Sequence, residues 1–309
     1  RVAEAVEAHG LSVEYIDCSG DPDSLDAIVI PQLKTALVDG TAPHVVEPRF
    51  PGAVECYVNL GDYYDHDALR QVKGEIISCM KGYKGCYQRA YRCLTAAAQI
   101  GEDMRSLLCT QALEEKMAKR ARGILSREVR KAGSDSGRPV QRFLGGVTWK
   151  GELCQFSTAD LLCKRIYELS DPYGLAHGML THLAHGAMAA GHDVIVCPSP
   201  MFPDRMEHLL IPSLSLGFVS STPALPYEKR PSRRLRLDAM ADSELLRRNK
   251  PRLKFSRKVS AALLEEAVES LAQAKAMHDD LEAVYNPRVD FEGVYRTADQ
   301  IAGTLLARL

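Results

Sequence analysis

The chain has 309 residues, a length typical of two domains. Its formal net charge is −1, so the chain as a whole has no field that attracts nucleic acid or a membrane surface. No apolar run reaches the ~20 residues of a membrane span and no signal peptide is evident. The nine cysteines include no CxxC pair, which suits a reducing compartment, so we expect a cytoplasmic protein.

The first half begins with a helical pattern over residues 1–9, which Gly10 ends. Residues 13–16 predict a short strand, and a turn-rich loop follows it. Residues 35–38 predict a buried strand that ends at Asp39.

After a proline-containing loop, residues 69–108 are mostly helical in pattern, and residues 112–129 predict a basic amphipathic helix. Residues 134–137 have the composition of a linker. We therefore place the boundary of two domains here, at 1–135 and 136–309.

The second half predicts a strand at 166–169, a loop, and a helix at 179–190 that Gly191 ends. The basic stretch from Lys229 to Lys258 has 12 lysine and arginine residues against three acidic ones. Helical patterns follow over residues 259–285 and 291–309.

Residues 10–41 occur again as residues 191–222, aligned without a gap. Nine of the 32 positions are identical, against ~2 expected from average residue usage. The pattern indicates an internal duplication, so we expect two α/β domains of similar plan, each with a helical extension.

In the second half, residues 171–178 lie between a strand and a helix, where mononucleotide-binding proteins have the phosphate loop GxxxxGK[ST]. Gly174 fits an interior position of that loop. Asp171 replaces its first glycine, His177 its lysine and Gly178 its serine or threonine. The second half therefore predicts a degenerate nucleotide site.

An aspartate at the end of the next buried strand holds Mg²⁺ through water in such proteins. The first half has Asp39 at this place, and the second half has Ser220. We therefore expect Asp39 to act as a magnesium-holding or catalytic residue.

The segments Asp21–Asp26, Ile30–Leu33 and Asp39–His44 resemble those of bacterial duplicated P-loop ATPases of uncharacterised function, over almost the whole chain. The resemblance implies tandem P-loop NTPase-like domains, ATP and Mg²⁺ as ligands, and ATP hydrolysis. Members of this family have an intact P-loop before the first helix. Counting back from His177 by the repeat offset places that lysine five residues before Arg1, so we expect this sequence to be a fragment.

Asp21 and Asp23 follow the strand at 13–16, which corresponds to the second strand of the P-loop plan, where small-molecule P-loop kinases place an acidic pair for substrate hydroxyls; turn formation beside Pro22 is the alternative. His44 is a candidate phosphate sensor, or a loop histidine with an ordinary hydrogen bond.

Two other functions stay open: a small-molecule phosphotransferase, and an interaction module that binds no nucleotide. A homo-oligomer is possible. Nucleic acid is not an expected partner, since the stretch from Lys229 to Lys258 is the only feature that points to one, and such charge is commonly a solvated face.

Overall fold

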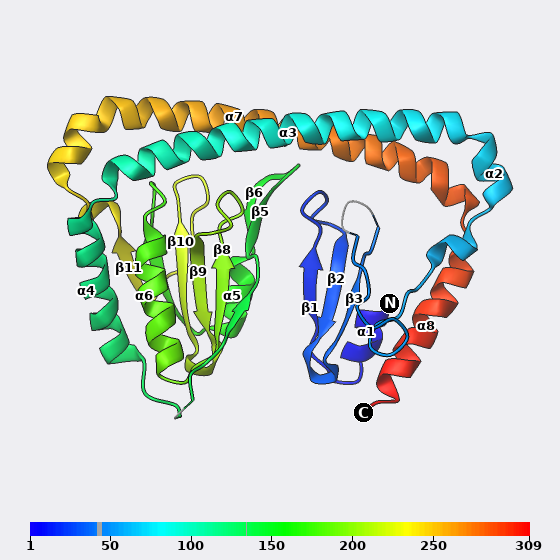
Figure 1. Cartoon of the computed structure of the whole chain (residues 1–309), viewed down its shortest axis with the longest axis horizontal. Helices are drawn as coiled ribbons and strands as arrows, with labels where there is room; N and C mark the ends of the chain where they lie inside the picture. The colour runs from blue at the N-terminus through cyan, green and yellow to red at the C-terminus, as the bar shows by residue number, and fades with distance from the viewer. Residues whose placement is uncertain (42–44, 134) are drawn as a thin grey trace. The chain divides into compact units, whose positions relative to one another are not determined.

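The computed structural model describes residues 1–41, 45–133 and 135–309 and has a mixed α/β fold with several sheets (Figure 1). Two compact units make up the chain. The first unit contains Arg1–Gln88 together with Ser270–Leu309, and the second contains Arg89–Glu269.

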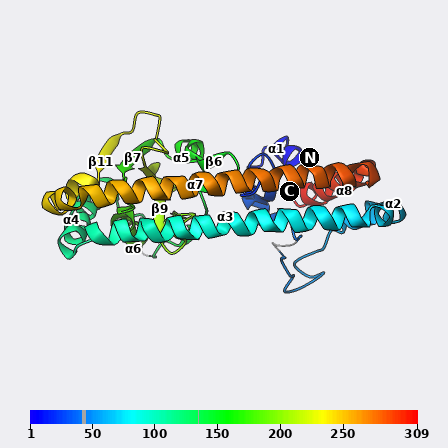
Figure 2. The same cartoon turned by 90° about the horizontal axis from the view of Figure 1, so that it is seen from above.

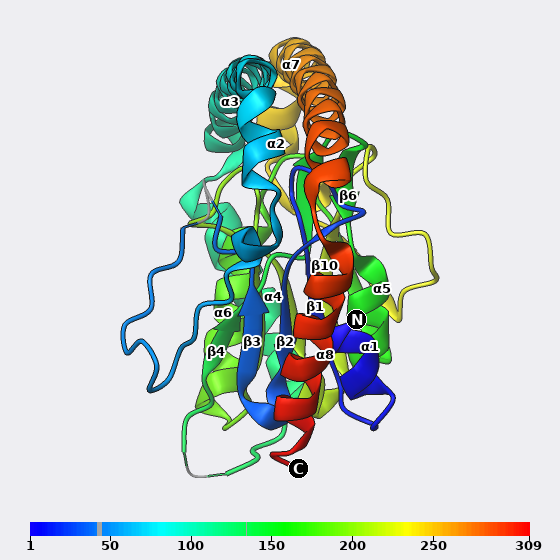
Figure 3. The ribbon, with the colours of Figure 1, turned by 90° about the vertical axis from the view of Figure 1, so that its right-hand side faces the viewer.

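The first unit is built on a small antiparallel sheet of order β1-β2-β3. Its sheet and first helix are α1 (Val2–Glu7), β1 (Glu14–Asp17), β2 (Leu25–Ile30) and β3 (Thr35–Val38). Its other helices are α2 (His66–Gln71), the start of α3 (Lys73–Leu108), the end of α7 (Ser243–Tyr285) and α8 (Phe291–Leu306). Figure 3 shows α8 beside α1, and the two helices share a core with β2 through Val6, Ile30 and Leu305.

The second unit has a six-stranded sheet of order β11-β7-β10-β9-β8-β4, in which β9 runs antiparallel to both neighbours and the other pairs are parallel. The strands are β4 (Pro139–Gln141), β7 (Arg165–Ser170), β8 (Val194–Pro198), β9 (Met206–Ile211), β10 (Leu216–Ser221) and β11 (Arg233–Arg236).

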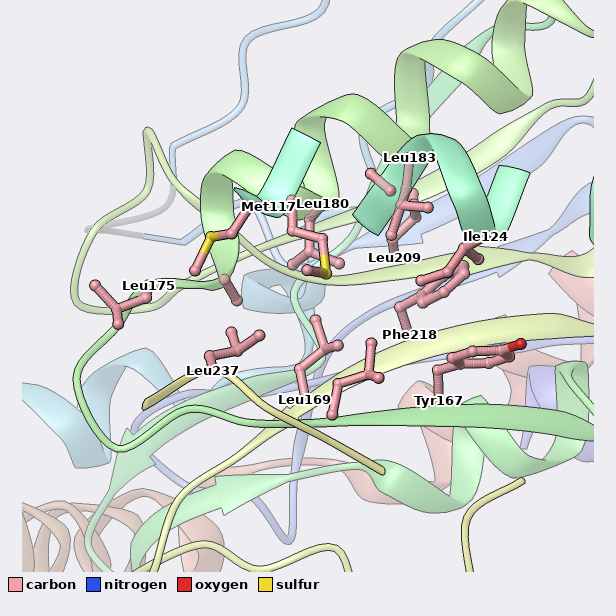
Figure 4. Packing of buried hydrophobic residues seen from close by; sticks show 14 of the residues in the cluster. Met117, Ile124, Tyr167, Leu169, Leu175, Leu180, Leu183, Leu209, Phe218 and Leu237 are labelled. Atoms are coloured by element: carbon pink, nitrogen blue, oxygen red, sulfur yellow. The ribbon is translucent and has the colours of Figure 1, made fainter. Parts of the chain in front are cut away.

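Two helices, α4 (Gln111–Glu128) and α6 (Ala176–Ala189), cover one face of this sheet. Figure 4 shows Leu180 and Leu183 of α6 in one buried cluster with Ile124 of α4 and with Leu209 and Phe218 of the sheet. The other face carries the hairpin of β5 (Gly145–Thr148) and β6 (Gly151–Cys154) and the helix α5 (Phe156–Leu162), with a core of its own.

The two repeated segments have the same elements and the same strand register. Glu14 pairs with Val29 in the first repeat, and Ile195 pairs with Leu210 in the second, each partner displaced by the repeat offset. The four residue pairs between β2 and β3 have their equivalents between β9 and β10. The register shift in β1, between Ile16 and Asp17, recurs in β8 between Cys197 and Pro198. The prediction that residues 10–41 and 191–222 fold alike is confirmed.

The two repeats also share a left-handed backbone conformation at equivalent positions. Lys34 has φ of 50° and Ser215 has φ of 48°, each directly after a 3-10 turn that begins with a proline. A left-handed conformation is uncommon for residues other than glycine, so its recurrence shows that the two turns have the same geometry.

Each unit receives a helix from the other half of the sequence. α4 follows the first repeat but packs on α6, which belongs to the second repeat; α8 follows the second repeat but packs on α1. The compact units therefore divide within α3 and α7, whereas the sequence pattern placed the boundary in the linker at residues 134–137.

Within the second unit, the end of α3 and the first part of α7 run side by side (Figure 2). An ion pair at 2.7 Å joins Arg252 of α7 to Asp103 of α3, and a second joins Arg89 to Glu266. α7 begins at Ser243, so much of the basic stretch is helical, although Pro251 lies inside the helix.

Candidate functional site

The segment compared with a phosphate loop forms a tight turn between β7 and α6. The turn contains Gly174 with φ of 69°, a left-handed conformation that favours glycine. α6 begins at Ala176, so the backbone N–H groups at its start point into the turn. The predicted order of strand, turn and helix is thus confirmed, although α6 begins three residues before the predicted start at 179.

The carboxylate of Asp171 occupies the start of α6. Its Oδ1 accepts a hydrogen bond from the N–H of Leu175 at 2.8 Å, and its Oδ2 accepts one from Ala176 at 2.7 Å. Burial raises the pKa of Asp171, whereas hydrogen bonds from the backbone N–H groups of residues 173–176 lower it.

In phosphate-binding proteins these N–H groups bind the oxygens of the phosphate. In this turn two of them already bind a side chain of the protein, and Asp171 is only 5% exposed. A phosphate would have to displace a buried carboxylate of like charge, so the turn as it stands disfavours nucleotide binding.

His177 also has a structural contact. Its Nδ1 accepts a hydrogen bond at 3.0 Å from the backbone N–H of Met206, which assigns the ring proton to Nε2. Burial lowers the pKa of His177, and the nearby positive charges of Arg205 and Arg105 lower it further. The ring is therefore neutral at neutral pH and does not supply the cation that the lysine of a phosphate loop provides.

Ser220 lies on β10 directly beside Leu169 of β7 and is buried. Its Oγ donates to the carbonyl of Glu207 at 2.7 Å, and its N–H donates to Nδ1 of His208 at 3.1 Å. The hydroxyl of Ser220, next to the turn, therefore already has a hydrogen-bond partner within the protein. Gly178 is on the first turn of α6 and has no side chain that could hold a metal ion.

Glu207 is an acid near Asp171 that the motif comparison missed. Burial raises the pKa of Glu207 to about 7; a hydrogen bond from Ser199 lowers it, and the charge of Asp171 raises it. Its only sequence signal is that it aligns with Asp26 of the first repeat.

In the first repeat, Asp39 directly follows β3 and is exposed. Its Oδ1 accepts hydrogen bonds from the N–H and the Oγ1 of Thr41, at 2.9 and 2.8 Å. Its backbone N–H donates to the carbonyl of Asp26 at 2.7 Å. The carboxylate is thus held at the end of the strand through Oδ1.

The two repeats differ at the strand edge beside this position. In the second repeat, β10 pairs in parallel with β7, which leads into the turn. In the first repeat, no strand of the described residues pairs with the outer edge of β3. Asp39 therefore lies at the end of an edge strand, β3. The equivalent strand of the second repeat, β10, lies beside β7, which leads into the turn at Asp171.

Asp21 and Asp23 lie in the loop after β1. Asp21 accepts a hydrogen bond from the N–H of Asp23 at 3.3 Å and forms an ion pair with Lys275 of α7 at 3.4 Å. Both contacts are of the kind that orders a turn. His44 lies outside the described residues.

One group of side chains in the described residues has the spacing of metal ligands: His278, Asp279 and Glu282 on α7. Asp279 forms an ion pair with Lys275, and His278 faces Glu282 at 3.5 Å. These are ordinary contacts one helical turn apart on a largely exposed face, and they indicate no metal site.

Comparisons with family models, with curated proteins and with solved structures gave no match to this chain. No helix in the described residues is long and apolar enough to cross a membrane.

Proposed function

We propose that this chain belongs to a duplicated P-loop ATP-binding protein, similar to the bacterial ATPases that its motifs resemble. In this proposal the two repeats are tandem P-loop NTPase-like domains. Mg²⁺-ATP is bound and hydrolysed at the first repeat, with Asp39 holding the metal through water. The second repeat binds no nucleotide and has a structural role.

The observation that carries the proposal is the shared register of the two repeats. It aligns Asp39 with Ser220, and Ser220 lies beside the strand that leads into the turn at Asp171. An acid at this place is suited to hold Mg²⁺ against a phosphate bound at such a turn. The pattern GxxxxGK[ST] does not occur in these 309 residues.

The second repeat supports the division of roles. Asp171 fills the place of the phosphate, His177 is neutral, and Ser220 stands where the first repeat has its acid. Three substitutions in one half each remove a different part of a nucleotide site.

Phosphate release from ATP by the protein expressed from its complete gene tests the proposal. Asp39→Asn should lower turnover by ~10²-fold or more, because the metal loses its carboxylate. The matched variant is Ser220→Ala, at the equivalent position, and it should leave turnover unchanged. Full turnover in Asp39→Asn would refute the role of Asp39.

A nucleotide-free interaction module is the second candidate, and the contacts of Asp171 favour it. It predicts no Mg²⁺-ATP binding by the complete gene product. A small-molecule phosphotransferase is less favoured, since the carboxylate of Asp21 is already paired with Lys275.

A further inference from the structure

The charge of the chain is divided unequally between its two units. The second unit, Arg89–Glu269, contains 28 lysine and arginine residues against 20 acidic ones, a net charge of +8. The remaining residues contain 11 basic and 20 acidic residues, a net charge of −9. The net charge of the whole chain is −1 because the acidic first unit offsets the strongly basic second unit.

The first part of α7 concentrates this positive charge. Between Ser243 and Ser260 the helix has seven basic residues and one acid, Glu244. One face of this part of the helix packs against the rest of the unit, since Leu253 and Ser256 are buried and Arg252 forms an ion pair with Asp103. Arg257 lies over the ring of Tyr173, and the other basic side chains of this stretch are exposed.

Four of them form a row. Arg247, Lys250, Lys254 and Lys258 are spaced by three or four residues and so lie on one side of the helix. All four are exposed, and within the described chain none forms an ion pair. The row is ~16 Å long, with cations ~5–6 Å apart.

Phe255 lies beside this row and is 69% exposed. An aromatic ring on a basic surface offers a stacking platform to an unpaired base, while the cations bind the phosphates. A membrane is less suited to this face: an interfacial helix inserts a broad apolar side, and here Leu253 on the apolar side belongs to the protein core.

We propose that this outward face of α7, formed by Arg247, Lys250, Phe255 and their basic neighbours, binds single-stranded nucleic acid. The inference is independent of ATP binding, because it uses none of the residues assigned to the nucleotide site. The nucleic acid is recognised through its backbone and one stacked base, so binding is not specific for sequence.

Fluorescence anisotropy with a labelled uridine oligonucleotide of about 20 nucleotides tests the proposal. The triple variant Lys250→Gln, Lys254→Gln, Lys258→Gln should weaken binding at least about tenfold near 100 mM salt. The slope of log affinity against log salt should fall by about 2, since three phosphate contacts are lost. Phe255→Ala should weaken binding to single strands about fivefold or more without changing that slope.

The control is Lys119→Gln, Arg120→Gln, Arg122→Gln on the outer face of α4. It removes the same charge from exposed residues of the same unit, and it should change affinity less than about twofold. Equal weakening by both triple variants would show a diffuse field rather than a site and would overturn the proposal. Absence of binding by the unaltered protein at about 50 mM salt, or preference for phosphatidylserine vesicles over the oligonucleotide, would overturn it as well.

Discussion

The carboxylate of Asp171 bonds the free N–H groups in the turn between β7 and α6. Helix N-termini attract anions because their N–H groups are unpaired, and the ligand there can be a phosphate or a side chain. Asp171 supplies the side chain and bonds two of these donors. The donors at the start of α6 are therefore bonded by a side chain of the protein itself.

Removing this carboxylate should destabilise the second unit. Asp171→Ala leaves buried N–H groups unpaired, and we expect a loss of about 1–3 kcal/mol in the free energy of unfolding. Trp149, the one tryptophan of the chain, lies in this unit, so its fluorescence in a urea titration reports the change. Asp204→Ala, in an exposed turn, should cost less than ~0.5 kcal/mol. Equal losses in the two variants would contradict the role given to Asp171.

Glu207 should make the stability of the same unit depend on pH. Its pKa is raised to about 7 in the folded state, so as pH rises the unfolded chain releases this proton first. The contribution of Glu207 to stability is therefore greatest below about pH 4.5 and is lost as pH rises to about 7.

Glu207→Gln should remove that loss and stabilise the unit at pH 8, relative to the unaltered protein, by about 1–2 kcal/mol. At pH 4 the two proteins should differ little. Urea titrations followed by Trp149 at both pH values check this, and a gain that is the same at both would contradict it.

At the scale of elements, most helices and strands could be predicted from periodicity and turn residues. The strand at 35–38 has the expected bounds, because the apolar run and Asp39 agree, but it is half exposed rather than buried, with Val38 54% exposed. α7 was predicted to begin some sixteen residues too late, since a basic run with Pro251 does not resemble a helix interior. The turn at Asp171 was located from its spacing, but the inward direction of its carboxylate depends on packing.

The exchange of α4 and α8 between the units could not be predicted, because an amphipathic pattern shows an apolar face without naming its partner. The two helices begin alike: Thr110 caps α4 through the N–H of Leu113, and Asp290 caps α8 through the N–H of Gly293. Each cap therefore stabilises a helix that follows one repeat in the sequence and packs in the core of the unit that contains the other repeat.

Thr110→Ala should cost the second unit about 1 kcal/mol, because the cap of α4 is lost. Asp290→Ala removes the equivalent cap of α8, which packs in the first unit, and should leave the unfolding reported by Trp149 within ~0.5 kcal/mol. If Asp290→Ala lowered the Trp149 transition as much as Thr110→Ala, the assignment of the helices to separate units would be wrong.

At the scale of the whole molecule, the two repeats share a fold but differ in the side chains at equivalent positions. The same strand register presents an acid, Asp39, in one repeat and Ser220 in the other. The charge is divided as well: basic residues predominate in the second unit, where Asp171 bonds the backbone N–H groups at the start of α6. We infer that the first repeat binds the nucleotide and that the second repeat has a structural role.

The number of nucleotides bound per chain tests this account most directly. Titration calorimetry of the complete gene product with ATP and Mg²⁺ should give one site. His177→Ala should leave that site intact, because His177 only holds the backbone of Met206. Two sites per chain, or a site that His177→Ala abolishes, would contradict the account.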